Sequence, residues 1–226
     1  MVEAVLDLPK TKQRKTLQVK TDVVERVILH DISWETYERI LAEHNEVSNP
    51  RFAYCDGELE IMTLGYQHET LKTKLSELIT EIARVLEIDY ETSGSTTFRK
   101  EKKRKGFEGD ASFYFKDADV VRAKKEIDLN IDPPPELVVE IDVTHGSLSK
   151  FPIFAGIGIE EIWRFDGDGI IFYRLQNEEY EEVAESVCLR GVKSETVTGL
   201  LFAAEEMKRS EWLKLVRRLI AKNSDV

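Results

Sequence analysis

Acidic side chains interrupt two segments of the sequence that are otherwise apolar. Asp110 opens the run 111–115, and Glu140 lies inside 137–143, the most apolar stretch that we predict as a strand. Because side chains alternate between the two faces of a strand, Asp142 is expected on the same face as Glu140. An unpaired buried carboxylate is costly, and two like charges at close range repel each other. These residues therefore need a partner.

A divalent cation between Asp110 and Glu140 would neutralise both carboxylates. Carboxylate oxygens are hard ligands, and they suit Mg²⁺ or Mn²⁺. The alternative is that these side chains lie at the ends of their strands, where water or salt bridges neutralise them.

Lys150 is predicted in the first turn of a short helix over 149–155, with Ser149 as N-cap and Pro152 in the first turn. The helix dipole disfavours a cation there by about 0.3–1 kcal/mol, and a residue in an unfavourable place is a candidate for function. Beside a metal, its ammonium could orient the attacking water or stabilise charge on a phosphate. The alternative is a surface lysine whose charged end reaches solvent.

His68 extends the apolar stripe of the predicted helix 68–88 into its first turn. A histidine in this position is either a hydrogen-bonded core residue or a member of the site. Glu58, Glu60 and Glu69 are further candidates for holding or positioning a metal, with a structural or solvated role as the alternative.

The elements that must position these residues alternate between helix and strand. This order predicts an α/β fold with a mixed central β-sheet flanked by helices. The predicted helices are 33–44, which Ser33 caps, then 68–88, 149–155 and 202–221; the predicted strands meet in hairpins at Asp56-Gly57 and 166–169, or span 92–99, 109–115, 137–143 and 180–188. The basic stretch 99–105 is interpreted as a solvated loop or as a contact to phosphate groups.

Length and composition limit the class of protein. The chain has 226 residues, of which 42% are hydrophobic, and no apolar run has the length of a bilayer span. Two cysteines form no disulfide framework, so we expect a cytoplasmic protein. Residues 1–28 are predicted to be a polar N-terminal arm and 29–226 the folded domain. The net charge of −11 argues against a protein that coats nucleic acid non-specifically.

Asp110, the segment 140–142 and Lys150 together resemble the PD-(D/E)xK nuclease superfamily. More narrowly, 29–221 resembles the bacterial restriction endonuclease domain family within that superfamily. The similar segments are SWETYERIL, GELEIM, GYQHE, GDASFYF and, most specifically, VVEID followed by LSK and GIGIEEIWRF.

The resemblance implies a restriction-endonuclease-like fold and Mg²⁺-dependent hydrolysis of phosphodiester bonds in DNA. It implies that Asp110 and Glu140 are metal ligands and that the carbonyl of Ile141 is a further ligand. Asp142 stands where the superfamily pattern has its lysine, so the resemblance makes Lys150 a relocated catalytic lysine. His68 matches a polar position at the start of the long helix, and Gly109 replaces the proline of the motif.

Three functions follow from these observations. The first is a metal-dependent endonuclease, which would act as a homodimer if it cuts both strands of a duplex. The second is an inactive nuclease fold that serves as a binding or regulatory module, which the negative charge and the displaced lysine favour. The third is a phosphohydrolase for small substrates. The sequence contains no P-loop, no dinucleotide-binding glycine motif, no GxSxG and no HExxH.

Overall fold

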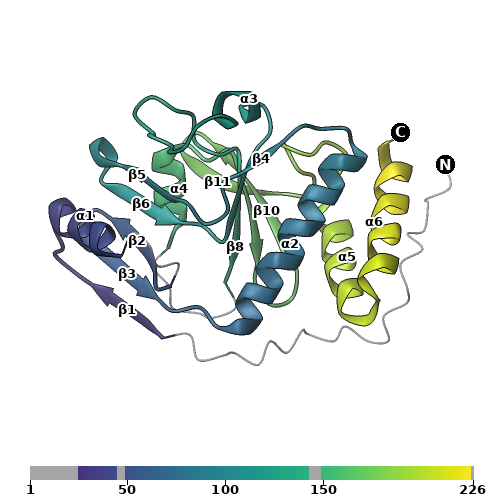
Figure 1. Ribbon diagram of the computed structural model, residues 1–226, viewed down its shortest axis with the longest axis horizontal. Coiled ribbons are helices and arrows are strands. Elements are labelled where there is room, and N and C mark those ends of the chain that lie inside the picture. Colours follow the sequence, from purple (N-terminus) through teal and green to yellow (C-terminus); the bar gives the residue numbers. More distant parts are fainter. Residues whose placement is uncertain (1–24, 45–48, 143–148, 225–226) are drawn as a thin grey trace.

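The computed structural model describes residues 25–44, 49–142 and 149–224 (Figure 1). Within these residues, the strands form two sheets, and the longer helices lie on their outer faces (Figure 1). The helices are α1 (Trp34–Glu43), α2 (Tyr66–Val85), α3 (Ala118–Val121), α4 (Phe151–Ile157), α5 (Ser194–Glu206), α6 (Arg209–Ser224) and the short 3-10 helix η1 (Glu101–Lys103).

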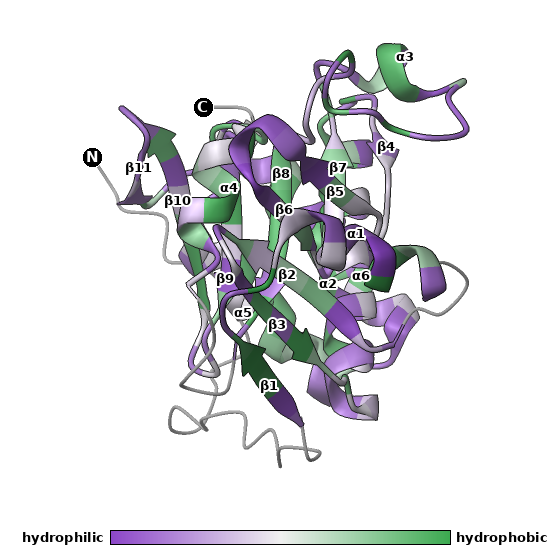
Figure 2. Ribbon diagram, turned by 90° about the vertical axis from the view of Figure 1, so that its left-hand side faces the viewer, coloured by the Kyte–Doolittle hydropathy of each residue, from purple (hydrophilic) through white to green (hydrophobic). Residues whose placement is uncertain are grey.

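The larger sheet has six strands in the order β11-β10-β9-β8-β7-β4. It is mixed, because β8 and β9 run parallel whereas the other neighbours are antiparallel. This confirms the predicted α/β class with a mixed sheet. Its strands are β4 (Glu91–Thr92), β7 (Ala111–Tyr114), β8 (Leu137–Ile141), β9 (Glu161–Phe165), β10 (Ile170–Gln176) and β11 (Glu179–Val183). All five residues of β8 are buried, and Figure 2 shows this strand as predominantly hydrophobic.

A second, antiparallel sheet was not predicted as a separate layer. Its five strands follow the order β1-β3-β2-β6-β5 and include the expected hairpin at Asp56-Gly57. The strands are β1 (Arg26–Leu29), β2 (Arg51–Cys55), β3 (Glu58–Met62), β5 (Thr97–Lys100) and β6 (Lys105–Glu108). The stretch 99–105 is therefore not a simple loop, because it contains the end of β5, η1 and the start of β6.

The apolar faces of the elements divide the core into layers. One face of the larger sheet packs against α2, α5 and α6, and the stripe of α2 that the sequence predicts is buried there. The other face packs against α4 and the second sheet through a separate cluster that includes Phe107 and Phe154. A third cluster, around Trp34 and Tyr37 of α1, covers the outer face of the second sheet. The larger sheet is thus covered on both faces.

Several boundaries differ from the sequence predictions. Helix α4 begins at Phe151 with Lys150, not Ser149, as its N-cap residue. The predicted single helix 202–221 is two helices, because Met207 has an extended conformation and ends α5. Of the predicted arm 1–28, residues 1–24 lie outside the described residues. Residues 26–28 belong to β1, so the folded part begins before residue 29. In the part of the chain that is described, no helix has the length and hydropathy that a membrane crossing needs.

Candidate active site

Asp110 and Glu140 lie side by side at one end of the larger sheet. Strands β7 and β8 are antiparallel, with Ala111 opposite Val139. Asp110 directly precedes β7, and its main-chain N–H donates to the Val139 carbonyl at 3.2 Å, so it lies beside the end of β8 that carries Glu140. Besides burial, the charge of Asp110 raises the pKa of Glu140, as expected for neighbouring carboxylates. Both side chains are buried, with 4% and 8% of their residue surface exposed. The predicted juxtaposition is present.

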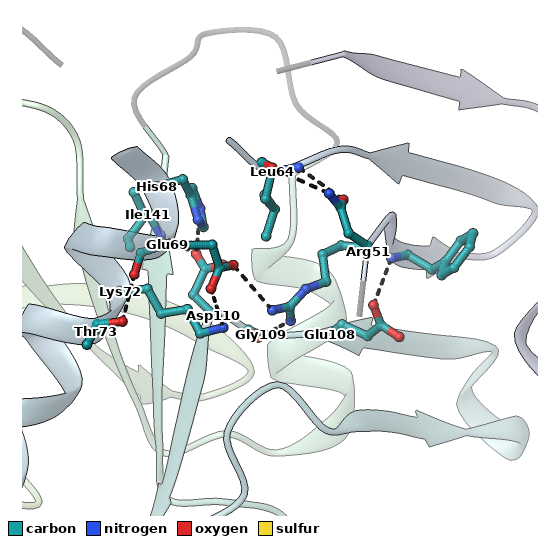
Figure 3. Close-up of polar contacts among 12 residues, drawn as sticks. Arg51, Leu64, His68, Glu69, Lys72, Thr73, Glu108, Gly109, Asp110 and Ile141 are labelled. Atoms are coloured by element: carbon teal, nitrogen blue, oxygen red, sulfur yellow. Dashed lines mark hydrogen bonds and ion pairs between the residues drawn. The ribbon is translucent and has the colours of Figure 1, made fainter. Parts of the chain in front are cut away.

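His68 and the main chain of Ile141 hold the Asp110 carboxylate. Asp110 Oδ2 accepts a hydrogen bond from Ile141 N at 2.8 Å and lies 3.3 Å from His68 Nε2 (Figure 3). Burial disfavours the charged form of Asp110, but His68 and Lys150 outweigh it and hold the pKa of Asp110 below its usual value. Burial also disfavours the charged form of His68, but the interactions with Asp110 and Glu140 outweigh burial and raise the pKa of His68. His68 is therefore a member of the site.

Lys150 reaches Glu140 from the N-cap position of α4. Its Nζ donates to Glu140 Oε1, and its side chain is only 9% exposed. Burial opposes the charged ammonium, but Glu140 and Asp110 outweigh burial and raise the pKa of Lys150. Burial also raises the pKa of Glu140 to about 7, an effect that Lys150 opposes and Asp110 reinforces. Lys150 is thus a buried cation in contact with one of the paired carboxylates, and not a surface lysine.

The second oxygen of Glu140 distinguishes this carboxylate from a purely structural one. Glu140 Oε2 is buried and has no hydrogen-bond partner among the described residues. Buried Glu161 is different, because Oε1 accepts from Trp163 at 2.6 Å and Oε2 accepts from Ser186 Oγ, Val187 N and Cys188 N at 2.8–3.0 Å. A buried oxygen without a donor is a place where a cation can bind.

These oxygens fit a hard divalent cation. The two carboxylates are adjacent, one oxygen is unpaired, and the carbonyl of Ile141 belongs to the same strand end as Glu140. Oxygen ligands of this kind suit Mg²⁺ and Mn²⁺. No group of three or more His, Cys, Asp or Glu side chains is arranged around a metal position within the described residues. A site here would therefore combine two carboxylates with a main-chain carbonyl and water.

Asp142 does not join the contacts of Asp110 and Glu140. It follows the end of β8, and its Oδ2 accepts from Arg164 Nη2 of β9 at 2.8 Å. Arg164 is the register partner of Glu140, so it lies beside the site. The like charge that Asp142 adds next to Glu140 is thus neutralised by a residue that the sequence analysis did not consider. Residues 143–148, which follow Asp142, lie outside the described residues.

The second sheet supplies the other wall of the site. A small pocket there is lined by Lys150 and by residues of β2, β3 and β6, namely Arg51, Phe52, Ala53, Glu60, Met62 and Glu108. Glu60 is buried and forms an ion pair with Arg26 at 3.1 Å. Glu58 lies away from the site and contacts His30. Burial raises the pKa of Glu108, although Thr97 and the main chain of Phe52 donate to it.

Arg51 holds the main chain directly before Asp110. Its Nη1 donates to the Gly109 carbonyl at 2.9 Å, which ties the residue before Asp110 to the second sheet (Figure 3). A side chain at position 109 would meet Val138 Cγ1 at 3.2 Å, so glycine suits this close approach. Arg51 and Glu108 were not among the predicted site residues, although a charged residue at the start of an apolar strand and an acidic residue two positions before Asp110 are visible in the sequence.

Comparison with known proteins gives a family. A model of the Uma2 family, described as "Putative restriction endonuclease", matches residues 34–203. Among solved structures, the crystal structure described as "a putative nuclease belonging to DUF820 from Anabaena variabilis ATCC 29413" aligns with a TM-score of 0.46 and 16% sequence identity, covering 78% of this chain and 98% of that chain. The comparison with curated proteins gives no significant match.

The raised pKa of Glu140 predicts how pH affects the stability of the metal-free protein. Folded Glu140, with a pKa of about 7, binds its proton more tightly than an unfolded glutamate with a pKa of 4.5. Its contribution to stability is therefore present below about pH 4.5 and is lost as the pH rises through about 7. His68, whose pKa is also raised, acts in the same direction. We expect the free energy of unfolding in EDTA to fall over this interval.

The variant Glu140→Gln keeps an acceptor for Lys150 and removes the titration. When urea unfolding is measured from pH 5 to pH 8, the free energy of unfolding of this variant should fall less steeply with pH than that of the wild-type protein. If the free energy of unfolding changes equally with pH in both proteins, the raised pKa of Glu140 is contradicted.

Proposed function

We propose, from the premise that the chain belongs to the Uma2 restriction endonuclease family, that it is a metal-dependent endonuclease that hydrolyses phosphodiester bonds in DNA. The observation that carries the proposal is the contact of buried Lys150 with Glu140, whose other oxygen has no donor among the described residues and whose pKa is raised by neighbouring Asp110 in addition to burial. Carboxylates, an unpaired oxygen and an ammonium at one strand end are the parts that hydrolysis of a phosphodiester requires.

Asp110, Glu140 and the carbonyl of Ile141 would hold the cation, which we propose is Mg²⁺, with Mn²⁺ as a substitute. When bound, such an ion supplies Lewis acidity toward a phosphate oxygen and lowers the pKa of a water ligand. His68 keeps Asp110 ionised and fixes its orientation through Oδ2, so this ligand is prepared before the cation arrives.

Lys150 would act on the phosphate and on the attacking water. An ammonium has three donors, and the contact with Glu140 uses one of them. The remaining donors can orient a water molecule or stabilise the negative charge that grows on the phosphate in the transition state. Because Lys150 is buried, its charge is weakly screened by solvent. We assign no catalytic step to Asp142, since Arg164 neutralises it.

We also propose that the protein acts in the cytoplasm as a homodimer. A twofold axis presents two equal sites to the antiparallel strands of a duplex, so a dimer can cut both strands in one binding event. Light scattering with size-exclusion chromatography should give about twice the monomer mass of 26.0 kDa. A monomeric mass that persists when duplex DNA is added would contradict the dimer and would leave nicking as the expected activity.

The activity is tested with plasmid and single-stranded DNA in the presence of Mg²⁺ or Mn²⁺. We expect the wild-type protein to cleave at least one of them and EDTA to stop the cleavage. Asp110→Asn and Lys150→Met should each lower the rate by about 100-fold or more, since the first removes a charged ligand of the cation and the second removes the ammonium that stabilises the transition state. The rates are measured from the fraction of intact DNA on gels.

Matched controls make the same chemical changes far from the site. Asp119→Asn changes an exposed aspartate of α3 that pairs with Arg122, and Lys116→Met removes an exposed lysine that pairs with Glu160; both residues follow the end of β7 that is opposite to Asp110. Both should cleave like the wild-type protein. Intact DNA under both metals would defeat the proposal, and hydrolysis of small phosphodiesters without cleavage of DNA would favour the phosphohydrolase.

An inactive binding or regulatory module is the second candidate, and the net charge of −11 favours it. Calorimetric titration with Mn²⁺ separates the two functions. A nuclease should bind the ion, and Asp110→Asn should weaken binding by about tenfold or more because one of two carboxylate ligands loses its charge. Folded wild-type protein that gives no heat of binding, and no metal-dependent rise in melting temperature, would favour the inactive module.

A further inference from the structure

Glu69 lies between two cations at the edge of the candidate active site. Its Oε1 is 3.9 Å from Arg51 Nη2, and its Oε2 is 3.0 Å from Lys72 Nζ (Figure 3). The first distance is beyond hydrogen-bond range, so Arg51 and Glu69 interact only as charges. The catalytic scheme above uses none of these three side chains.

The three side chains differ in burial. The Arg51 side chain is 4% exposed and is held by its bond to the Gly109 carbonyl, and Lys72 is 19% exposed. Glu69 is 46% exposed, so its carboxylate can turn into solvent, whereas Arg51 cannot move away. Arg51 Nε is buried and has no hydrogen-bond partner among the described residues. Arg51 is therefore held in place, and the anion between the two cations is exchangeable.

This arrangement adjoins the residues that would carry out hydrolysis. Gly109, which accepts from Arg51, directly precedes Asp110, and Glu69 directly follows His68 in the first turn of α2. A negatively charged group between Arg51 and Lys72 would thus lie next to the Asp110 carboxylate. Without a local basic region, a protein with a net charge of −11 has little attraction for DNA.

We propose that Arg51 and Lys72 form a subsite for a DNA backbone phosphate, and that Glu69 occupies this subsite in the absence of DNA. Guanidinium and ammonium groups are the side chains that bind phosphate oxygens best, and a carboxylate resembles a phosphate in charge and in its acceptor oxygens. DNA binding displaces Glu69 into solvent, where the positive end of α2 still stabilises its charge. The inference rests on the proposed nuclease function for its substrate class.

The subsite predicts effects of opposite sign for two neighbouring residues. Lys72→Met removes a phosphate contact and should weaken DNA binding by about fivefold. The slope of the logarithm of the binding constant against the logarithm of salt concentration should become smaller by about one. Glu69→Gln removes the competing anion and should tighten binding by about two- to fivefold. A purely structural role for this ion pair would make both variants weaker.

Fluorescence anisotropy measures these affinities with labelled single-stranded and duplex oligonucleotides. EDTA prevents cleavage, and the salt concentration is varied from about 50 to 200 mM. Controls on the same helix are Lys74→Met and Glu77→Gln, whose ion pairs with Glu205 and Arg209 face α5 and α6. Both controls should bind like the wild-type protein. The test does not depend on a variant of buried Arg51, which could fail to fold.

Three results would overturn the subsite: no DNA binding by the wild-type protein, equal affinities for Lys72→Met and Lys74→Met, or weaker binding by Glu69→Gln. Because the measurement needs neither metal nor cleavage, the two proposals fail separately. A protein that shows the expected signs but never cuts DNA keeps the phosphate subsite and loses the nuclease function.

Discussion

Repulsion between two buried carboxylates on neighbouring strands is the constraint on which the rest of this structure depends. Asp110 directly precedes β7 and is bonded to Val139 of β8, next to Glu140, and less than a tenth of either residue is exposed. In the protein interior such repulsion is screened far less than in water. The pair persists because cations from other elements reach it, and those elements are arranged around this end of the sheet.

The cations come from opposite sides of the larger sheet. Helix α2 packs on one face and brings His68 in its first turn, whereas α4 packs on the other face and brings Lys150 at its N-cap. The second sheet adds Arg51, which fixes the main chain directly before Asp110. Each layer of the fold thus contributes a positive side chain to the same strand ends. No single helix or strand could supply all of these side chains, because residues of one element approach the strand ends from one side only.

The sequence was sufficient for the parts of this arrangement that depend on local pattern. The apolar stripe of α2, the buried strand β8 and the two hairpins follow from periodicity and turn residues, and Asp110, Glu140, Lys150 and His68 could be selected as polar interruptions of those patterns. The second sheet was harder to predict, because β6 and β5 lie within a strongly basic stretch whose pairing is decided by tertiary contacts. Arg51, Glu108 and Arg164 were missed for the same reason: their partners Gly109, Phe52 and Asp142 are 58, 56 and 22 residues away in the sequence. Such distances leave no periodic signal.

The position of Lys150 is best understood together with that of Asp142. In the resembled superfamily pattern a lysine occupies the place of Asp142, two residues after Glu140 on the same strand. Here that place carries a negative charge, and Arg164 on the adjacent strand β9 neutralises it at 2.8 Å. The cation for Glu140 must then come from another element, and Lys150 of α4 supplies it. With His68, whose pKa Asp110 and Glu140 raise against the effect of burial, beside Asp110, every acidic side chain of this group has a basic partner, so the fold can close before any metal binds. What remains for a metal is the second oxygen of Glu140, for which the described residues provide no donor. Charge pairing therefore stabilises the folded chain, and the unpaired oxygen keeps the site open to a divalent ion.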